Sequence, residues 1–293
     1  MSQKVLVAGA TGDMGGRIVK ALLARKADVT ALVRKGSDPK KIADLEQAGA
    51  TVYQADLSNI AEIAAACKDV SCVVSALAGL RDVIVDTQLN ILKGAVEAGV
   101  PRFIPSDFAT DFTQIPVGEN RNFDLRKEFR EHLDKSPIKA TSIFNGAFAD
   151  ILRYNTPIFD TKNKTIVYYD GKKDWKVEFT TKDNAAMFTA MAALDDDAPR
   201  NLYIASFSVS PQDLEQLSEQ YKGEKYELVN KGSLADFSAS LKAWRASDPE
   251  GETNLYSKWQ QAQYLHSMFY AHHTKLDNDR YPTIEWASVE SYI

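Results

Sequence analysis

The sequence predicts an α/β protein: a doubly wound parallel sheet, followed by a smaller C-terminal α+β region. A glycine-rich turn near the N-terminus separates an apolar run from a segment of helical period. Strand-like and helix-like segments then alternate regularly as far as about residue 150, and this alternation fades afterwards. We therefore expect one domain over residues 1–150 and a second region over residues 151–293, partly interleaved with the first.

The first element is the apolar run at residues 5–8, which leads through a GxxGxxG turn into a helix that begins near Asp13. Gly9 suits a tight turn, Gly12 lets the main chain approach a diphosphate, and Gly15 lets the helix lie close to the strand. The positive end of the helix would face the anion. The alternative is an ordinary strand-to-helix turn. We expect a Rossmann-type NAD(P)-binding domain whose diphosphate is held by Gly9, Ala10, Thr11, Gly12, Asp13, Met14 and Gly15.

The end of the second strand, residues 28–33, bears on the choice of cofactor. Arg34 and Lys35 follow it, and no acidic residue lies between positions 32 and 37. An acid at this place holds the ribose 2′-hydroxyl of NAD, whereas a cation meets the 2′-phosphate of NADP. We therefore expect NADP(H) to be preferred over NAD(H), with Arg34 and Lys35 or Lys41 holding the phosphate. The alternative for Arg34 is a solvated charge.

Three more strands are expected at residues 51–55, 71–76 and 100–105, with helices at 58–67 and 87–98 between them. Ligands bind at the carboxyl ends of such strands. Asp56 either contacts the adenine or caps the helix at 58–67. The residues expected near the cofactor at these strand ends are Asp56, Leu57, Ala76, Leu77, Ala78 and Gly79, and Ser106 is expected beside the nicotinamide.

A helix at residues 122–135 is expected next, because Leu125, Phe129 and Leu133 recur every four residues. A sixth strand at 138–144 follows it. We expect Asn145 and Phe148, which come after this strand, and Phe108, which comes after the fifth, to lie near the substrate.

Beyond residue 150 the expected strands are 165–169, 175–180 and 201–209, and the expected helices are 181–193, 211–221 and 234–246. Five aromatic residues recur at three to five positions across a further helix, and their spacing favours a core role over a ligand cage. They are Tyr256, Trp259, Tyr264, Phe269 and Tyr270. The pair His272 and His273 has no partner at metal-ligand spacing, so we expect no metal site.

The composition of the chain argues against nucleic-acid binding and membrane association. The formal net charge of −5 argues against a nucleic-acid surface. No run approaches the roughly 18 apolar residues of a membrane span, and the N-terminus leads straight into a strand, so we expect no membrane partner and a cytoplasmic location. Cys67 and Cys72 lack a metal-binding pattern and are expected to be core thiols.

Several motifs resemble the NmrA-like and isoflavone-reductase-like branch of the atypical short-chain dehydrogenases. Besides the glycine turn and Arg34, they are residues 102–108 (RFIPSDF), 123–127 (FDLRK), 142–148 (SIFNGAF) and 276–282 (LDNDRYP), with Trp286. The resemblance implies NADPH-dependent reduction, since members include reductases of phenylpropanoid ethers and isoflavones and quinone-reductase-like enzymes. The branch also includes non-enzymatic NADP sensors.

The resemblance places a catalytic lysine in the helix after the fifth strand. In this chain the matching position is Arg126, and a lysine comes one residue later, at Lys127, about 100° round the helix. Arginine can neutralise an oxyanion but is a poor proton donor. The Tyr-x-x-x-Lys pair of ordinary short-chain dehydrogenases is missing at the equivalent positions, which read Asn122-x-x-x-Arg126 or Phe123-x-x-x-Lys127 and supply no phenol. The implied catalytic residues are Lys127 or Arg126, with Ser106.

The leading hypothesis is an NADPH-dependent oxidoreductase that reduces a small aromatic or conjugated substrate, of the quinone, enone or carbonyl type, by hydride transfer. The alternative is a non-catalytic NADP(H)-binding redox sensor that acts through a protein partner. The missing Tyr-x-x-x-Lys pair favours the sensor, whereas a C-terminal region large enough to close a pocket favours the enzyme. A third possibility is a reductase descendant that has lost its chemistry.

Overall fold

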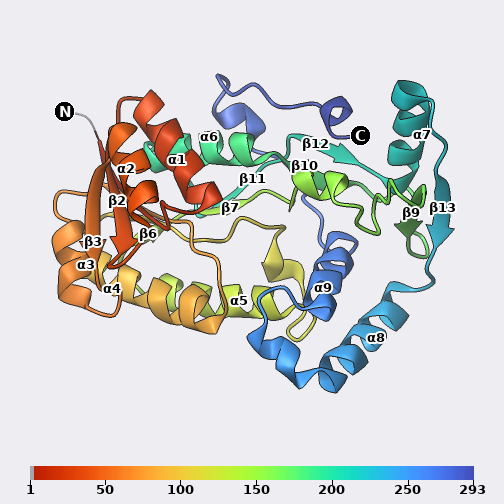
Figure 1. The fold of residues 1–293 in the computed structure, drawn as a ribbon, viewed down its shortest axis with the longest axis horizontal. Helices are drawn as coiled ribbons and strands as arrows, with labels where there is room; N and C mark the ends of the chain where they lie inside the picture. The colour runs from red at the N-terminus through yellow and green to blue at the C-terminus, as the bar shows by residue number, and fades with distance from the viewer. Residues whose placement is uncertain (1–2) are drawn as a thin grey trace. The chain divides into compact units, whose positions relative to one another are not determined.

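A computed structural model describes residues 3–293 (Figure 1). The chain divides into two compact units, each built from separate stretches of sequence. The first unit comprises the residues up to Asp107 together with Leu125–Ile143 and Ala185–Leu202. The second comprises Phe108–Asp124, Phe144–Asn184 and Tyr203–Ile293. A division of function at residue 150 stays a prediction.

The first unit is built on a six-stranded parallel sheet with the order β3-β2-β1-β4-β5-β6. Its strands are β1 (Lys4–Ala8), β2 (Asp28–Arg34), β3 (Thr51–Ala55), β4 (Cys72–Ser75), β5 (Arg102–Ile104) and β6 (Lys139–Ala140). The predicted doubly wound parallel sheet is confirmed. In the register, Ala8 of β1 pairs with Leu32 on one side and Ser75 on the other, so the carboxyl ends of these strands meet at one edge.

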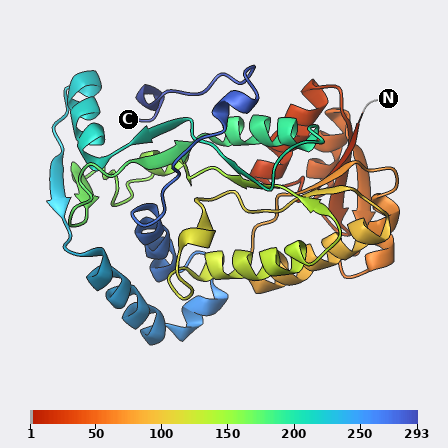
Figure 2. The same cartoon turned by 180° about the vertical axis from the view of Figure 1, so that it is seen from behind.

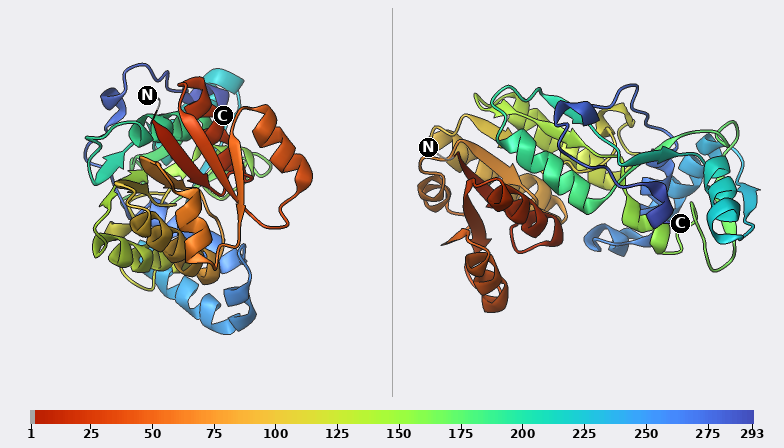
Figure 3. Two further views of the ribbon diagram at one scale, coloured as in Figure 1. Left: turned by 90° about the vertical axis from the view of Figure 1, so that its left-hand side faces the viewer. Right: turned by 90° about the horizontal axis from the view of Figure 1, so that it is seen from above.

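Helices cover both faces of this sheet. α1 (Asp13–Ala24) and α6 (Lys182–Ala193) lie on one face, and α3 (Ile60–Ala66), α4 (Gln88–Glu97) and α5 (Arg121–Asp134) lie on the other (Figures 1 and 2). The view from above shows α1 and α6 together on the near side of the sheet (Figure 3). On the second face, Leu6, Val73 and Phe103 form a buried core with Phe129 and Leu133 of α5. α2 (Pro39–Gln47) connects β2 to β3, and Asp38 caps its first turn.

Two strands predicted as continuous are each divided in the structure. The prediction of one strand over 138–144 was wrong: β6 ends at Ala140, and β7 (Ser142–Phe144) pairs instead with β11 (Asn201–Tyr203). The predicted strand over 201–209 is likewise β11 and a separate β12 (Phe207–Val209). In both cases the two halves take different partners, so the strand breaks where the partner changes.

The second unit holds two small sheets. β12, β10 (Val177–Thr180) and β8 (Ala147–Phe148) form one, and β9 (Thr165–Tyr168) pairs in parallel with β13 (Glu227–Asn230) in the other. β8 and β13 were not predicted from the sequence. The helices α7 (Pro211–Lys222) and α8 (Leu234–Ser247) match the predicted ones closely, and α9 (Lys258–Met268) is the aromatic helix. In the core of this second unit, Phe159, Phe179 and Phe269 are fully buried.

Short helical turns complete the chain: a π-helical η1 (Asp82–Thr87), which runs into α4, and the 3-10 turns η2 (Phe112–Gln114), η3 (Ala149–Arg153), η4 (Pro249–Thr253), η5 (Asn278–Arg280) and η6 (Val289–Ser291). The aromatic residues around α9 divide in role. Trp259 and Phe269 are fully buried, as the core prediction requires, but Tyr256 and Tyr270 are 70% and 42% exposed.

The two consecutive histidines follow α9 instead of lying on it. His273 is 6% exposed, its Nε2 accepts the N–H of Asp111 at 3.2 Å, and its ring packs on Tyr203 with centroids 5.0 Å apart. Burial lowers the pKa of His273 from 6.5 to about 4, against the opposing charge of Asp111. The side chain is therefore a neutral core histidine at physiological pH.

We expect this histidine to make the fold acid-sensitive. Because its folded pKa lies below its unfolded value of 6.5, the unfolded chain takes up the proton first as the pH falls. The stabilisation is complete above pH 6.5 and is lost as the pH falls to about 4. Between pH 7.5 and 4.5 the loss is about 2 to 3 kcal/mol.

Urea unfolding at these two pH values measures the loss. His273→Gln is the control, because glutamine can accept the Asp111 N–H but does not titrate. The wild type should lose about 2 kcal/mol more than the variant between the two pH values. Equal losses of unfolding free energy in the two proteins would show that His273 is not the source of the acid sensitivity.

Candidate functional site

The glycine turn lies between β1 and α1, and its geometry requires glycine. Gly9 has a φ of +80°, and a Cβ there would lie 2.6 Å from the carbonyl oxygen of Ala76. A Cβ on Gly15 would lie 2.2 Å from the carbonyl oxygen of Gly9. Gly12 caps α1 with extended backbone and no side-chain bond, and its own N–H donates to Gly9 at 2.9 Å. The helix start is thus open to an anion, which the backbone N–H groups and the helix dipole would bind.

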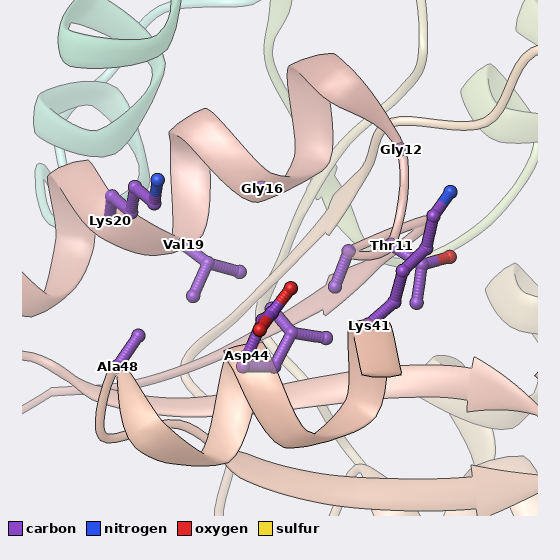
Figure 4. A pocket seen from close by; sticks show the side chains of 10 residues that line it. Thr11, Gly12, Gly16, Val19, Lys20, Lys41, Asp44 and Ala48 are labelled. Carbon is purple, nitrogen blue, oxygen red and sulfur yellow. The ribbon is translucent and has the colours of Figure 1, made fainter. Parts of the chain in front are cut away.

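A pocket of about 150 Å³ lies beside this turn, between α1 and α2. It is lined by Ala10, Thr11, Gly12, Gly16, Val19, Lys20, Lys41, Asp44, Leu45 and Ala48. Figure 4 shows Lys41 reaching from the start of α2 toward the turn at Thr11. Because whole cofactor sites enclose roughly 300–1,000 Å³, this pocket has room for only one part of a dinucleotide.

The two cations at the end of β2 have different surroundings. Arg34 is exposed as the last residue of β2. Lys35 is tied down, since its Nζ lies 2.8 Å from Oε1 of Glu62. The other oxygen of Glu62 accepts the N–H of Asp56 at 2.9 Å, and the bond from Lys35 holds the pKa of Glu62 below its usual range. The Lys35 ammonium therefore already has a carboxylate partner.

Asp56 closes a turn after β3 and does not cap the helix. Its Oδ1 accepts from the N–H and hydroxyl of Ser58 at 2.9 and 2.7 Å, and these bonds lower its pKa. The predicted capping alternative was wrong, because α3 begins at Ile60 and Asn59 is its N-cap. Leu57 is partly buried against the core.

The ends of β1, β4 and β5 bring several predicted residues together. The N–H of Ala76 donates to Ala8 at 2.9 Å, and Gly9 packs against the carbonyl of Ala76. The hydroxyl of Ser106 donates to the carbonyl of Leu77 at 2.6 Å. Ala78 is exposed, and Gly79 is crowded, since a Cβ there would lie 2.5 Å from the Val83 side chain. Ser106 is thus fixed beside the loop after β4.

Asp107 forms a buried charged network that sequence reasoning missed. It is 2% exposed and bonded to the hydroxyl of Ser142. Arg200 and Arg130 donate to the same hydroxyl at 2.6 and 3.3 Å. Burial raises the pKa of Asp107, against the Ser142 bond and the charges of Arg126, Arg200 and Arg130. The residue belongs to a motif quoted for the family resemblance, but its partners come from distant segments.

Arg126 and Lys127 both lie on α5 and are both partly buried. The packed face of this helix is the predicted one, since Phe129 and Leu133 are each 1% exposed and Leu125 lies at its margin. The catalytic roles of Arg126, Lys127 and Ser106 stay predictions.

The predicted substrate residues belong to the second unit. Asn145 is fully buried, its N–H donates to Ala109 at 2.9 Å, and its carbonyl accepts from Thr180 at 2.6 Å. Phe148 lies in β8 and Phe108 precedes the isolated bridge at Ala109, and both are partly buried. Their contact with a substrate stays a prediction.

Over residues 3–293, no group of three or more His, Cys, Asp or Glu side chains could hold a metal ion. In the same part of the chain, none of the helices combines the length and the apolar character needed to cross a membrane.

Comparison with known proteins places these features in context. A model of the NmrA-like family matches residues 1–230. Pinoresinol reductase 2 of Arabidopsis thaliana is 34% identical over 215 residues, 68% of this chain and 66% of that protein. Pinoresinol reductase 1 of the same plant is 30% identical over 276 residues, 86% of this chain and 84% of that protein. The solved structure of AtPrR2 with NADP+ and (+)pinoresinol superposes with a TM-score of 0.82 at 26% identity, covering 100% of this chain and 98% of that one.

Proposed function

We propose a function for this chain on the basis that it belongs to the NmrA-like family. It is an NADPH-dependent oxidoreductase of the atypical short-chain dehydrogenase type that reduces a small aromatic or conjugated substrate. The observation that carries this proposal is the likeness to a pinoresinol reductase over 86% of the chain. The glycine turn supports it independently, because its shape suits a diphosphate and admits no side chain at Gly9 or Gly15.

When bound, NADPH supplies the hydride, and the chain's residues hold and orient it. The helix start at Gly12 and Asp13 takes the diphosphate, with Thr11 beside it. Arg34 holds the 2′-phosphate, assisted by Lys41, which lines the pocket at the turn. Lys35 contributes less, because Glu62 already neutralises it. Ala76, Leu77 and Ser106 line the ribose and nicotinamide side.

The substrate class follows from the relatives, one of which was solved with pinoresinol, an aromatic compound. In this chain Arg126 takes the place of the family lysine as a fixed positive charge near the reacting atoms. A guanidinium stabilises developing negative charge but stays protonated, so the proton required by the reduced substrate comes from water or from Lys127. Phe108 and Phe148, which are both partly buried, contact the substrate. Asn145 is fully buried and supports this region through its backbone bonds to Ala109 and Thr180.

The reductase is favoured over the redox sensor, because the relatives reported above are reductases. A protein partner is part of the proposal only in the sensor alternative. We place the enzyme in the cytoplasm, a reducing compartment that suits Cys67 and Cys72, which are both free and buried.

Cofactor titration and turnover test this proposal together. The wild type should bind NADPH more tightly than NADH in calorimetry, and it should oxidise NADPH in the presence of pinoresinol, a quinone or an aryl enone. Arg34→Ala removes a charge-assisted phosphate contact, so NADPH affinity should fall by about ten- to a hundredfold while NADH affinity stays unchanged.

Lys35→Ala is the matched control, since it removes the neighbouring cation that Glu62 already holds. Its NADPH affinity should change by less than about threefold. Tight NADPH binding without oxidation by any of these substrates would favour the sensor. An Arg34→Ala variant whose NADPH affinity falls by less than about threefold would refute the role of Arg34.

A further inference from the structure

We propose that Gln88 is a positioning residue that fixes Ser106 just after the carboxyl end of β5. Gln88 is the first residue of α4, and it is 1% exposed. A glutamine is rarely buried this deeply unless its amide is hydrogen-bonded, so its partners indicate its role. This inference rests on the proposed function, which places Ser106 on the ribose and nicotinamide side of the cofactor.

The side-chain amide of Gln88 connects two backbone groups. Its Oε1 accepts the N–H of Ser106 at 2.9 Å, and its Nε2 donates to the carbonyl of Ile84 at 2.8 Å. The reverse orientation of the amide would set two donors against each other at Ser106 and two acceptors against each other at Ile84. Both partners therefore fix the same orientation of the Gln88 amide.

The π-helical turn η1 makes room for this side-chain bond. In an α-helix the N–H of Gln88 would donate to Ile84, four residues earlier. Here it donates to Val83 and Val85, and the side chain of Gln88 takes the carbonyl of Ile84 instead. The side chain is thus held by its own helix, and it reaches Ser106 in one fixed position.

The hydroxyl of Ser106 is fixed as well. It donates its single hydrogen to the carbonyl of Leu77 at 2.6 Å, in the loop that follows β4. Because the hydrogen is used in this way, Ser106 Oγ can only accept a hydrogen bond from a bound molecule. The nicotinamide half of NADPH carries suitable donors in its carboxamide and ribose groups. Gln88 determines where this acceptor lies, because it holds the backbone of the same residue.

Gln88→Met tests this role, because methionine has a similar length but no amide. The buried N–H of Ser106 then loses its acceptor, so we expect Ser106 to shift. In calorimetry, NADPH affinity should fall by about tenfold, whereas affinity for 2′,5′-ADP, which lacks the nicotinamide half, should stay within about threefold. General damage to the fold would weaken the binding of both ligands. Equal losses of affinity for the two ligands would therefore overturn the proposal.

A double-mutant cycle with Ser106→Ala tests whether Gln88 acts through the serine hydroxyl. In the Ser106→Ala background no hydroxyl remains to be positioned, so Gln88→Met should change NADPH affinity by less than about twofold. Additive effects of the two substitutions on NADPH affinity would contradict the positioning role.

Thr87→Val is the matched control. The hydroxyl of Thr87 donates to the carbonyl of Asp82 at 2.8 Å, so valine removes a side-chain bond of the same π-helical turn that does not involve Ser106. NADPH affinity should stay within about twofold of the wild type. A loss as large as that of Gln88→Met would show that the turn as a whole matters and not the Gln88–Ser106 bond.

Amide hydrogen exchange gives a second readout, which needs no cofactor. The N–H of Ser106 should exchange slowly in the wild type and at least about tenfold faster in Gln88→Met, with Thr87→Val matching the wild type. Exchange of Ser106 in the wild type at the rate of an unfolded peptide would overturn the proposal, even if Gln88→Met fails to fold. A wild type that shows slow exchange at Ser106 but binds no NADPH would instead refute the proposed function and leave the Gln88–Ser106 contact standing.

Discussion

Gly15→Ala is expected to weaken NADPH binding by at least about a hundredfold, or about 3 kcal/mol. The added methyl would lie 2.2 Å from the carbonyl oxygen of Gly9, 2.7 Å from its carbonyl carbon and 3.0 Å from Cα of Ala10. All three are backbone atoms, so no side-chain rotation relieves the clash. The Gly9–Ala10 peptide must move, and it forms the turn that would face the diphosphate. The same overpacking should lower the free energy of unfolding by roughly 1–3 kcal/mol.

The adjacent glycine supplies the control. A methyl on Gly16 would lie 3.4 Å from the carbonyl oxygen of Ala10, a distance that a small adjustment can accommodate. Alanine also favours the helix by about 1 kcal/mol over glycine. Gly16→Ala should therefore bind NADPH within about threefold of the wild type and unfold at a higher urea concentration. Calorimetry measures the NADPH affinity of both variants. Equal losses of affinity in the two variants, or no loss of affinity in Gly15→Ala, would show that the turn does not bind the cofactor.

The first unit could be predicted because its signals are local. Parallel strands buried on both faces appear as continuous apolar runs, as residues 5–8 do, and the glycine turn lies within a few positions of the strand that it ends. The strand at 138–144 could not be predicted correctly for the opposite reason. Ala140 pairs with Phe103, whereas β7 pairs with β11. No sequence pattern near Thr141 indicates that the strand partner changes there.

The same limit applies to the candidate site. The cations Arg34 and Lys35 are adjacent, and the sequence does not distinguish them. Only the structure shows that Lys35 forms an ion pair with Glu62. The buried network of Asp107 could not be predicted because Ser142 and Arg200 reach it from other segments. Charge partners that come together only through tertiary packing leave no periodic pattern.

The residue on α5 that acts on the substrate can be identified by substitution. We expect Arg126→Gln to lower kcat by about 100- to 1,000-fold, the usual cost of removing a group that stabilises developing negative charge. The Kd for NADPH should stay within about threefold, because the loss is of transition-state binding alone. Stopped-flow NADPH oxidation with the best substrate of the panel measures the chemical step.

Two further substitutions separate charge from proton donation. Arg126→Lys keeps a cation on the same helix face but introduces a group that titrates, with an ordinary pKa of about 10.4. The lysine variant should therefore regain part of the activity and show a basic limb in its kcat–pH profile that the wild type lacks. Lys127→Ala changes the neighbouring side chain, about 100° round the helix, and should cost less than about threefold if Arg126 is the acting residue. A larger loss in Lys127→Ala than in Arg126→Gln would transfer the role to Lys127, and it would make the lysine, with its exchangeable proton, the acid that completes the reduction.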